Sequence, residues 1–91
     1  MKDMSILMEY ACNRMYCIDI KERGPIKGLL MNYNNGNIIL LSEAGIYHIL
    51  YNDIVSMRPI SYNIALKNCN KNYIKAISDY LEIDSELLMN F

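Results

Sequence analysis

Residues 26–42, IKGLLMNYNNGNIILLS, decide the fold, because four turn-forming residues stand between two apolar runs. The turn is Asn34-Asn35-Gly36-Asn37. Asparagine and glycine tolerate the left-handed backbone conformations that tight turns demand, so Asn-Gly between apolar segments is a strong hairpin signal. We therefore predict two antiparallel strands, over residues 26–33 and 38–42, joined by this turn.

Three further strands are predicted around this hairpin. Residues 14–21 alternate apolar and polar side chains, which is the period of a half-buried strand. Residues 46–51 and 54–58 are rich in β-branched and aromatic side chains, and only Asn52-Asp53 interrupts them. Pro59 is expected to stop regular pairing, because proline has no N–H to donate. Five short strands joined mostly by tight turns favour a closed or nearly closed barrel, with the strands in a meander.

Helices are predicted on both sides of the strands. Asp3 can cap a short amphipathic helix that ends near residue 11. Residues 61–69 alternate as a strand would, but no partner is evident, so they form either an extension of the last strand or a linker. The helical period returns after residue 70, and this C-terminal amphipathic helix either continues to residue 91 or gives way to a new short helix capped by Asp84.

Length and composition indicate a single domain. The chain has 91 residues, of which 53% are hydrophobic and 21% charged, values typical of one small globular unit. We expect residues 1–60 to form the barrel with its first helix, and residues 61–91 to complete the same domain. The formal charge of −1 excludes a strongly basic protein that would collect nucleic acid through its overall field.

Targeting and metal signals are weak. We find no apolar run of the length of a signal peptide or membrane helix, so the expectation is a cytoplasmic protein without a membrane partner. Cys12, Cys17 and Cys69 are an odd number of cysteines and are expected to be reduced. With His48 they could collect zinc, but they lack the Cys-x2-Cys spacing of structural zinc modules. Buried thiols acting as small hydrophobic side chains are the favoured interpretation, and no metal or cofactor is expected.

The order of these elements resembles the Sm-like small β-barrels, including the bacterial Hfq branch, over residues 3–59. Gly28 fits the bent second strand of such a barrel, where a residue without a Cβ is needed. Asn34 departs from the family pattern, in which an acid follows the aromatic residue that ends the second strand. The matching segments are Ile26-Lys27-Gly28, Tyr33-Asn34-Asn35-Gly36-Asn37-Ile38-Ile39-Leu40 and Tyr51-Asn52-Asp53-Ile54-Val55-Ser56.

A second departure concerns the RNA site of the family. The Tyr-Lys-His motif of the Hfq branch aligns with Tyr51-Asn52-Asp53, where an amide and an acid replace the basic pair. The Arg-Gly pair of the eukaryotic and archaeal members is also missing. The resemblance thus supports the fold more strongly than it supports RNA binding.

The resemblance also implies self-assembly. Sm-like barrels pair the fourth strand of one subunit with the fifth strand of the next, so residues 46–51 and 54–58 are the expected contacts of a homo-oligomer. The sequence offers an independent reason, because residues 46–57 carry no edge lysine and only Asp53 as an inward charge that would block edge addition. The C-terminal helix could instead cover the edge and keep the protein monomeric or dimeric.

The candidate binding residues lie in the hairpin turn and in the break between the last two strands. An aromatic ring can stack on a base, and amides can hydrogen-bond a base edge without a net charge. The residues are Tyr33, Asn34, Asn37, Tyr51, Asn52 and Asp53. Under the first hypothesis they bind RNA or a nucleotide-sized ligand; the simpler interpretation is that the asparagines form turns and Tyr33 packs on the barrel.

Other functions are less well supported. His48 is the only histidine, and no nucleophile or phosphate-cradling glycine loop stands in a pattern that would make an active site, so we predict no enzymatic activity. The alternative function is that of a small regulatory or inhibitory protein, of the kind that phages carry, which binds another protein. It would use the apolar face of residues 71–91 and the edge of the barrel.

Overall fold

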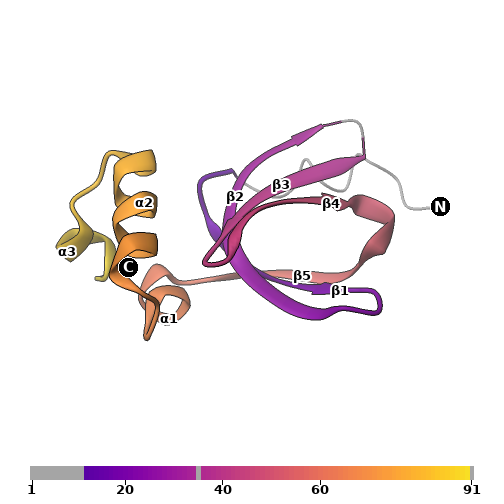
Figure 1. Cartoon of the computed structure of the whole chain (residues 1–91), viewed down its shortest axis with the longest axis horizontal. Helices are drawn as coiled ribbons and strands as arrows, with labels where there is room; N and C mark the ends of the chain where they lie inside the picture. The colour runs from indigo at the N-terminus through magenta and orange to yellow at the C-terminus, as the bar shows by residue number, and fades with distance from the viewer. Residues whose placement is uncertain (1–11, 35, 91) are drawn as a thin grey trace.

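The computed structural model describes residues 12–34 and 36–90, which form a five-stranded sheet with helices at one end (Figure 1). The predicted N-terminal helix lies outside the described residues. The elements are β1 (Met15–Ile20), β2 (Gly24–Asn34), β3 (Asn37–Ser42), β4 (Gly45–Leu50), the single-turn 3-10 helix η2 (Tyr51–Asp53), β5 (Ile54–Ile60), α1 (Tyr62–Leu66), α2 (Lys71–Leu81) and α3 (Ser85–Leu88).

The five predicted strands are all present, and each pairs antiparallel with its neighbours. Their order in the sheet is β4-β3-β2-β1-β5, so the first four form a meander and β5 returns beside β1. Among the described residues, β4 and β5 are the two edges of the sheet, and the sheet does not close. The prediction of a closed barrel is therefore not confirmed. η2 turns the chain after β4, and β5 then takes the free side of β1 instead of pairing with β4.

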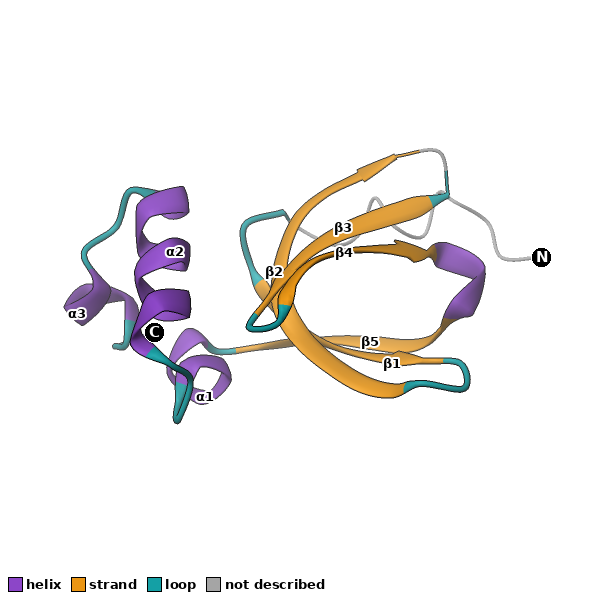
Figure 2. Cartoon of the chain, viewed as in Figure 1, coloured by secondary structure: helices purple, strands orange, loops and turns teal. Residues whose placement is uncertain are grey.

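The sheet curls because the long strand β2 is bent: its first part pairs with β1 and its last part pairs with β3 (Figure 2). Gly28 lies at the middle of this 11-residue strand, opposite Tyr16. A Cβ at this position would lie 2.7 Å from Cγ of Leu40 and 2.8 Å from the carbonyl oxygen of Leu41, so only glycine allows β3 to approach this closely. A register shift at residues 30–32 of β2 adds to the bend.

Two apolar clusters follow from this curl. The inner cluster takes residues from every strand and from η2: Tyr16, Ile18, Ile20, Leu30, Ile38, Leu40, Ile49, Tyr51 and Ile54. The outer cluster joins the opposite face of the sheet to the helices: Met15, Leu29, Ala65, Leu66, Tyr73, Ile77 and Leu88. The helices thus pack on β1 and β2, which are central strands, and the apolar face of α2 is used within the chain's own core.

The structure corrects two expectations near the end of the sheet. β5 continues through Pro59, which pairs with Tyr16, and ends one residue later. An edge strand tolerates proline because the missing N–H can lie on its open side. Residues 61–69 form neither a strand nor a plain linker, because α1 lies within them. The helix buries Ala65 and Leu66, whereas Ile64, which would share a strand face with Leu66, is 65% exposed.

The C-terminal region follows the second of the two predicted arrangements. Asn70 caps α2, its side-chain oxygen accepting the N–H of Tyr73 at 2.8 Å. α2 ends at Glu82, which has the left-handed φ of 58°. Asp84 then caps α3 by accepting the N–H of Glu86 at 2.8 Å.

Candidate binding site at the hairpin end

The structure brings the two predicted site segments together at the end of the sheet that lies away from the helices (Figure 1). The N–H of Tyr51 in η2 donates to the carbonyl oxygen of Gly36 in the β2–β3 turn, at 2.6 Å. Asn37 pairs with Asn34 on one side and with Leu50 on the other. Gly36 and η2 are therefore in direct contact through their backbones.

The two predicted tyrosines have different surroundings. Tyr51 belongs to the inner cluster and is only 6% exposed, so its ring is not open for stacking. Tyr33 packs against the same cluster but is only half-buried. Of the two rings, that of Tyr33 is the one that can contact a ligand, and its buried side packs against the inner cluster.

The amide groups at this end are accessible to different degrees. Asn34 and Asn52 are exposed, and Asn37 is half-buried. Sequence reasoning missed Asn32, which is also exposed and whose side-chain oxygen accepts the N–H of Tyr33 at 2.8 Å, leaving its NH2 group to donate. The sequence signal for Asn32 was its position two residues before Asn34, because side chains two apart on a strand lie on the same face.

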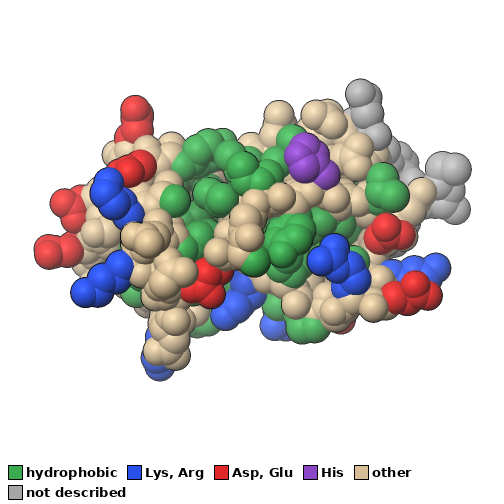
Figure 3. Space-filling model, viewed as in Figure 1, with side chains coloured by type: hydrophobic (Ala, Val, Ile, Leu, Met, Phe, Trp, Pro, Cys, Tyr) green, Lys and Arg blue, Asp and Glu red, His purple; other side chains and the backbone are tan. Residues whose placement is uncertain are grey.

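Asp53 and His48 complete the surroundings. The carbonyl oxygen of Asp53 accepts the N–H of Lys21 at 2.7 Å, which ties η2 to the end of β1. His48 is exposed on β4 and pairs with Ile39 on β3. Figure 3 shows the His48 imidazole at the surface beside hydrophobic side chains. This side of the sheet therefore combines amides, an imidazole and apolar groups.

Two general features bear on what the site can do. Within residues 12–34 and 36–90, no three His, Cys, Asp or Glu side chains lie close enough together to hold a metal ion. In the same part of the chain, no helix is long and apolar enough to cross a bilayer.

Comparisons with known proteins add no family to these observations. No family model, no curated protein and no solved structure matches the chain.

Proposed function

We propose that this chain is a non-enzymatic, Sm-like binding module that assembles through its edge strands and binds single-stranded RNA, or a nucleotide, at the hairpin end. The observation that carries the proposal is the contact between the β2–β3 turn and η2, which places the exposed amides of Asn34 and Asn52 at the same end of the sheet. Hydrogen bonds from these amides would supply part of its affinity.

Assembly is supported by the position of β4 and β5 at the two edges of the sheet that the described strands form. The outer side of an edge strand can pair with a strand of another chain. Both edges also carry exposed apolar side chains: Ile46 and Leu50 on β4 are each 56% exposed, and Val55 on β5 is 64% exposed. Pairing β4 of one copy with β5 of the next would cover all three residues. Repeated around an axis, this head-to-tail contact closes into a ring.

Ligand binding is supported by the chemistry of the amides. An asparagine side chain offers two donors and one acceptor oxygen, which is what a base edge requires. Asn34 and Asn52 are exposed, and the half-buried ring of Tyr33 lies on the opposite face of β2 from Asn34, against the inner cluster. With a formal charge of −1 the chain has no global attraction for phosphates, so binding should depend only weakly on salt.

Molar mass in solution tests the assembly. We expect light scattering on the purified chain to give a multiple of 10.6 kDa. Leu50→Lys should reduce this mass, because a lysine at an edge opposes strand addition. Ile64→Lys is the matched control, since Ile64 is similarly exposed but lies on α1, and it should leave the mass unchanged. A wild-type mass of 10.6 kDa at every concentration would contradict the assembly.

Fluorescence anisotropy with short single-stranded RNAs of each base, and competition by free nucleotides, tests the binding site. Asn34→Ala should weaken binding by about tenfold, because the loss of one or two hydrogen bonds removes about 1–1.5 kcal/mol. Asn72→Ala, an exposed asparagine on α2, is the control and should bind as the wild type does. The site is wrong if the wild type binds no RNA or nucleotide, or if Asn34→Ala binds equally well.

The alternative, a regulatory protein that binds a partner through residues 71–91, has limited surface available. Tyr73, Ile77 and Leu88 are buried against the sheet. Among the described residues of this segment, the large apolar side chains that are exposed are Tyr80, Ile83 and Leu87. Capture of one defined protein partner that is lost in Leu87→Lys but kept in Asn34→Ala would favour this alternative over RNA binding.

A further inference from the structure

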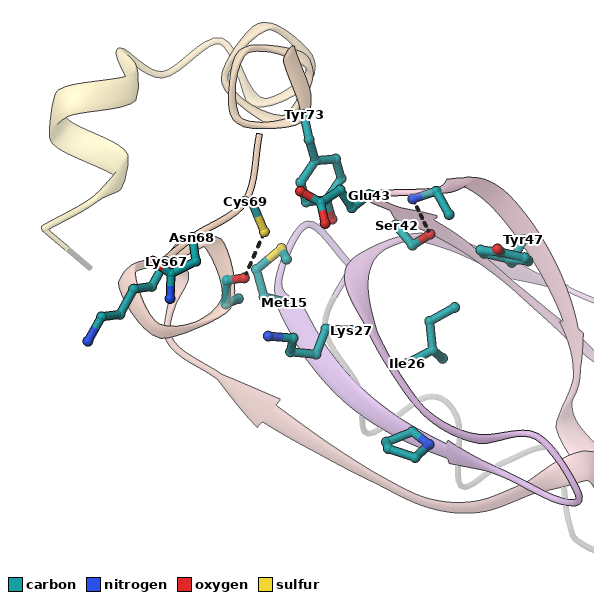
Figure 4. A pocket seen from close by; sticks show the side chains of 13 residues that line it. Met15, Ile26, Lys27, Ser42, Glu43, Tyr47, Lys67, Asn68, Cys69 and Tyr73 are labelled. Carbon is teal, nitrogen blue, oxygen red and sulfur yellow. Dashed lines mark hydrogen bonds between the residues drawn. The ribbon is translucent and has the colours of Figure 1, made fainter. Parts of the chain in front are cut away.

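A cavity of about 510 Å³ lies between the sheet and the helices, at the opposite end from the hairpin surface (Figure 4). Its walls come from the start of β2, the β3–β4 turn, β4, the segment between α1 and α2, and α2. Sites for small molecules commonly enclose about 300–1,000 Å³. The cavity therefore has the size of a metabolite site, and it is separate from the residues of the proposed RNA surface.

Glu43 and Lys27 border this cavity as opposite charges that do not neutralise each other, and the side chain of a third charged lining residue, Lys67, points away from them (Figure 4). Glu43 is in the β3–β4 turn and Lys27 is on β2, and both side chains are exposed. Among the described residues, Glu43 and Lys27 form an ion pair neither with each other nor with any other side chain. The ion pair found in this part of the chain joins Lys75 to Asp79. One carboxylate oxygen of Glu43 accepts the N–H of Asn70 at 2.6 Å, which holds the side chain in place, and the thiol of Cys69 lies beside the same carboxylate.

Tyr73 supplies a second acceptor next to Glu43. Its hydroxyl donates to the carbonyl oxygen of Leu41 at 2.7 Å, so the lone pairs of the phenol oxygen remain available. Figure 4 shows the phenol and the Glu43 carboxylate close together. Burial raises the pKa of Tyr73, and the nearby Cys69 and Glu43 raise it further, so the phenol stays neutral. A carboxylate beside a neutral phenol oxygen is a suitable environment for an ammonium group.

The other end of the cavity is apolar. Ile26 and Tyr47 line it, and both are partly buried against the inner cluster. Figure 4 shows them on the side away from Asn68 and Cys69. The guanidinium of Arg23 lies 5.5 Å from the centre of the Tyr47 ring, and this contact helps to hold the ring. A ligand can therefore place an apolar group here while its charged groups stay near Lys27 and Glu43.

We propose that this cavity binds a free α-amino acid with an apolar side chain. The ammonium group lies between Glu43 and the hydroxyl oxygen of Tyr73, the carboxylate faces Lys27, and the side chain packs on Ile26 and Tyr47. A zwitterion complements both unpaired charges at once. A phosphate dianion is repelled by Glu43, and a simple amine leaves Lys27 without a partner and is repelled by it.

Titration of the wild-type chain with L-phenylalanine tests the proposal, with binding followed by calorimetry and by the NMR signals of Ile26 and Tyr47. Phenethylamine lacks the carboxylate and 3-phenylpropionate lacks the ammonium group. We expect saturable binding of L-phenylalanine and at least tenfold weaker binding of each analogue. Absence of L-phenylalanine binding at millimolar concentration, equal binding of the three compounds, or shifts confined to other residues would overturn the proposal.

Variants assign the two charges. Lys27→Gln should weaken the binding of L-phenylalanine about tenfold and should not weaken the binding of phenethylamine. Glu43→Gln should weaken the binding of L-phenylalanine and should not weaken the binding of 3-phenylpropionate. Glutamine at position 43 keeps the acceptor for the N–H of Asn70, so the fold is preserved. Lys71→Gln is the control, because Lys71 is exposed on α2 and does not line the cavity. If the control weakens binding as much as Lys27→Gln does, the assignment of the carboxylate to Lys27 is wrong.

Discussion

Replacing Gly28 with alanine should destabilise the fold by about 3 kcal/mol, the upper end of the range of about 1–3 kcal/mol for overpacking. The new Cβ would lie 2.7 Å and 2.9 Å from Cγ and Cδ2 of Leu40, and 2.8 Å from the carbonyl oxygen of Leu41. Leu40 is fully buried, and the Leu41 oxygen belongs to the backbone of a central strand. Neither can move away without disturbing the packing of β2 on β3.

Thermal unfolding followed by far-UV circular dichroism, at one fixed protein concentration, measures this loss. For a domain of this size a loss of 3 kcal/mol corresponds to a fall in Tm of about 12–24 °C. Ser56→Ala is the control, because Ser56 is an exposed residue on the edge strand β5, and its effect should stay within about 0.5 kcal/mol. If Gly28→Ala changes stability no more than this control, the argument that glycine is needed for the curl is refuted.

A double substitution checks the cause. Leu40→Ala alone should cost about 2–5 kcal/mol, because it leaves a cavity in the inner cluster. The same change removes two of the three close contacts that an alanine at position 28 would make. The double variant should therefore be more stable than the sum of the two single losses predicts. Simple additivity would mean that Gly28 and Leu40 do not interact in this way.

Three further predictions concern the helical end. Leu88→Ala should lower the free energy of unfolding by about 2–5 kcal/mol, because Leu88 is fully buried. Leu87→Ala should change it by less than about 0.5 kcal/mol, because the Leu87 side chain is 56% exposed. Urea unfolding measures both values. Asn70→Ala should cost about 0.5–2 kcal/mol in the same assay through loss of the α2 cap, and Asn70→Asp should retain most of the stability. Burial raises the pKa of Tyr73, so the folded chain favours the neutral phenol. This contribution to the free energy of unfolding is complete below the tyrosine pKa of about 10 in the unfolded chain and is lost as the pH rises further. Tyr73→Phe should therefore lose less stability at alkaline pH than the wild type does, and an unchanged dependence of stability on pH would contradict this prediction.

Sequence reasoning found most of the candidate surface, because the turn that forms it is local. The Asn-Gly pair predicted the hairpin, and the short break after residue 51 predicted the second segment. The exposure of Tyr33 and Tyr51 could not be predicted, because both are tyrosines in similar apolar surroundings. Only the curl of the sheet turns Tyr51 into the core and leaves Tyr33 half-exposed.

The cavity at the helical end had no sequence signal at all. Lys27, Glu43 and Tyr73 are far apart along the chain and belong to no motif. They meet because α2 packs on the outer cluster, and this packing carries Tyr73 to the β3–β4 turn. A site assembled from three separate elements depends on contacts that periodicity and turn chemistry do not encode.

The amino-acid sequence determined the number, direction and approximate limits of the strands, and the amphipathic helix after residue 70. These features depend on hydrophobic period and turn residues, which act over a few positions. Tertiary structure decided that β5 continues through Pro59, that residues 62–66 form a helix instead of a strand, and that β4 and β5 are the edges of the described sheet. The physical reason is that each of these outcomes depends on which surface a segment packs against or pairs with, and that surface exists only once the chain has folded.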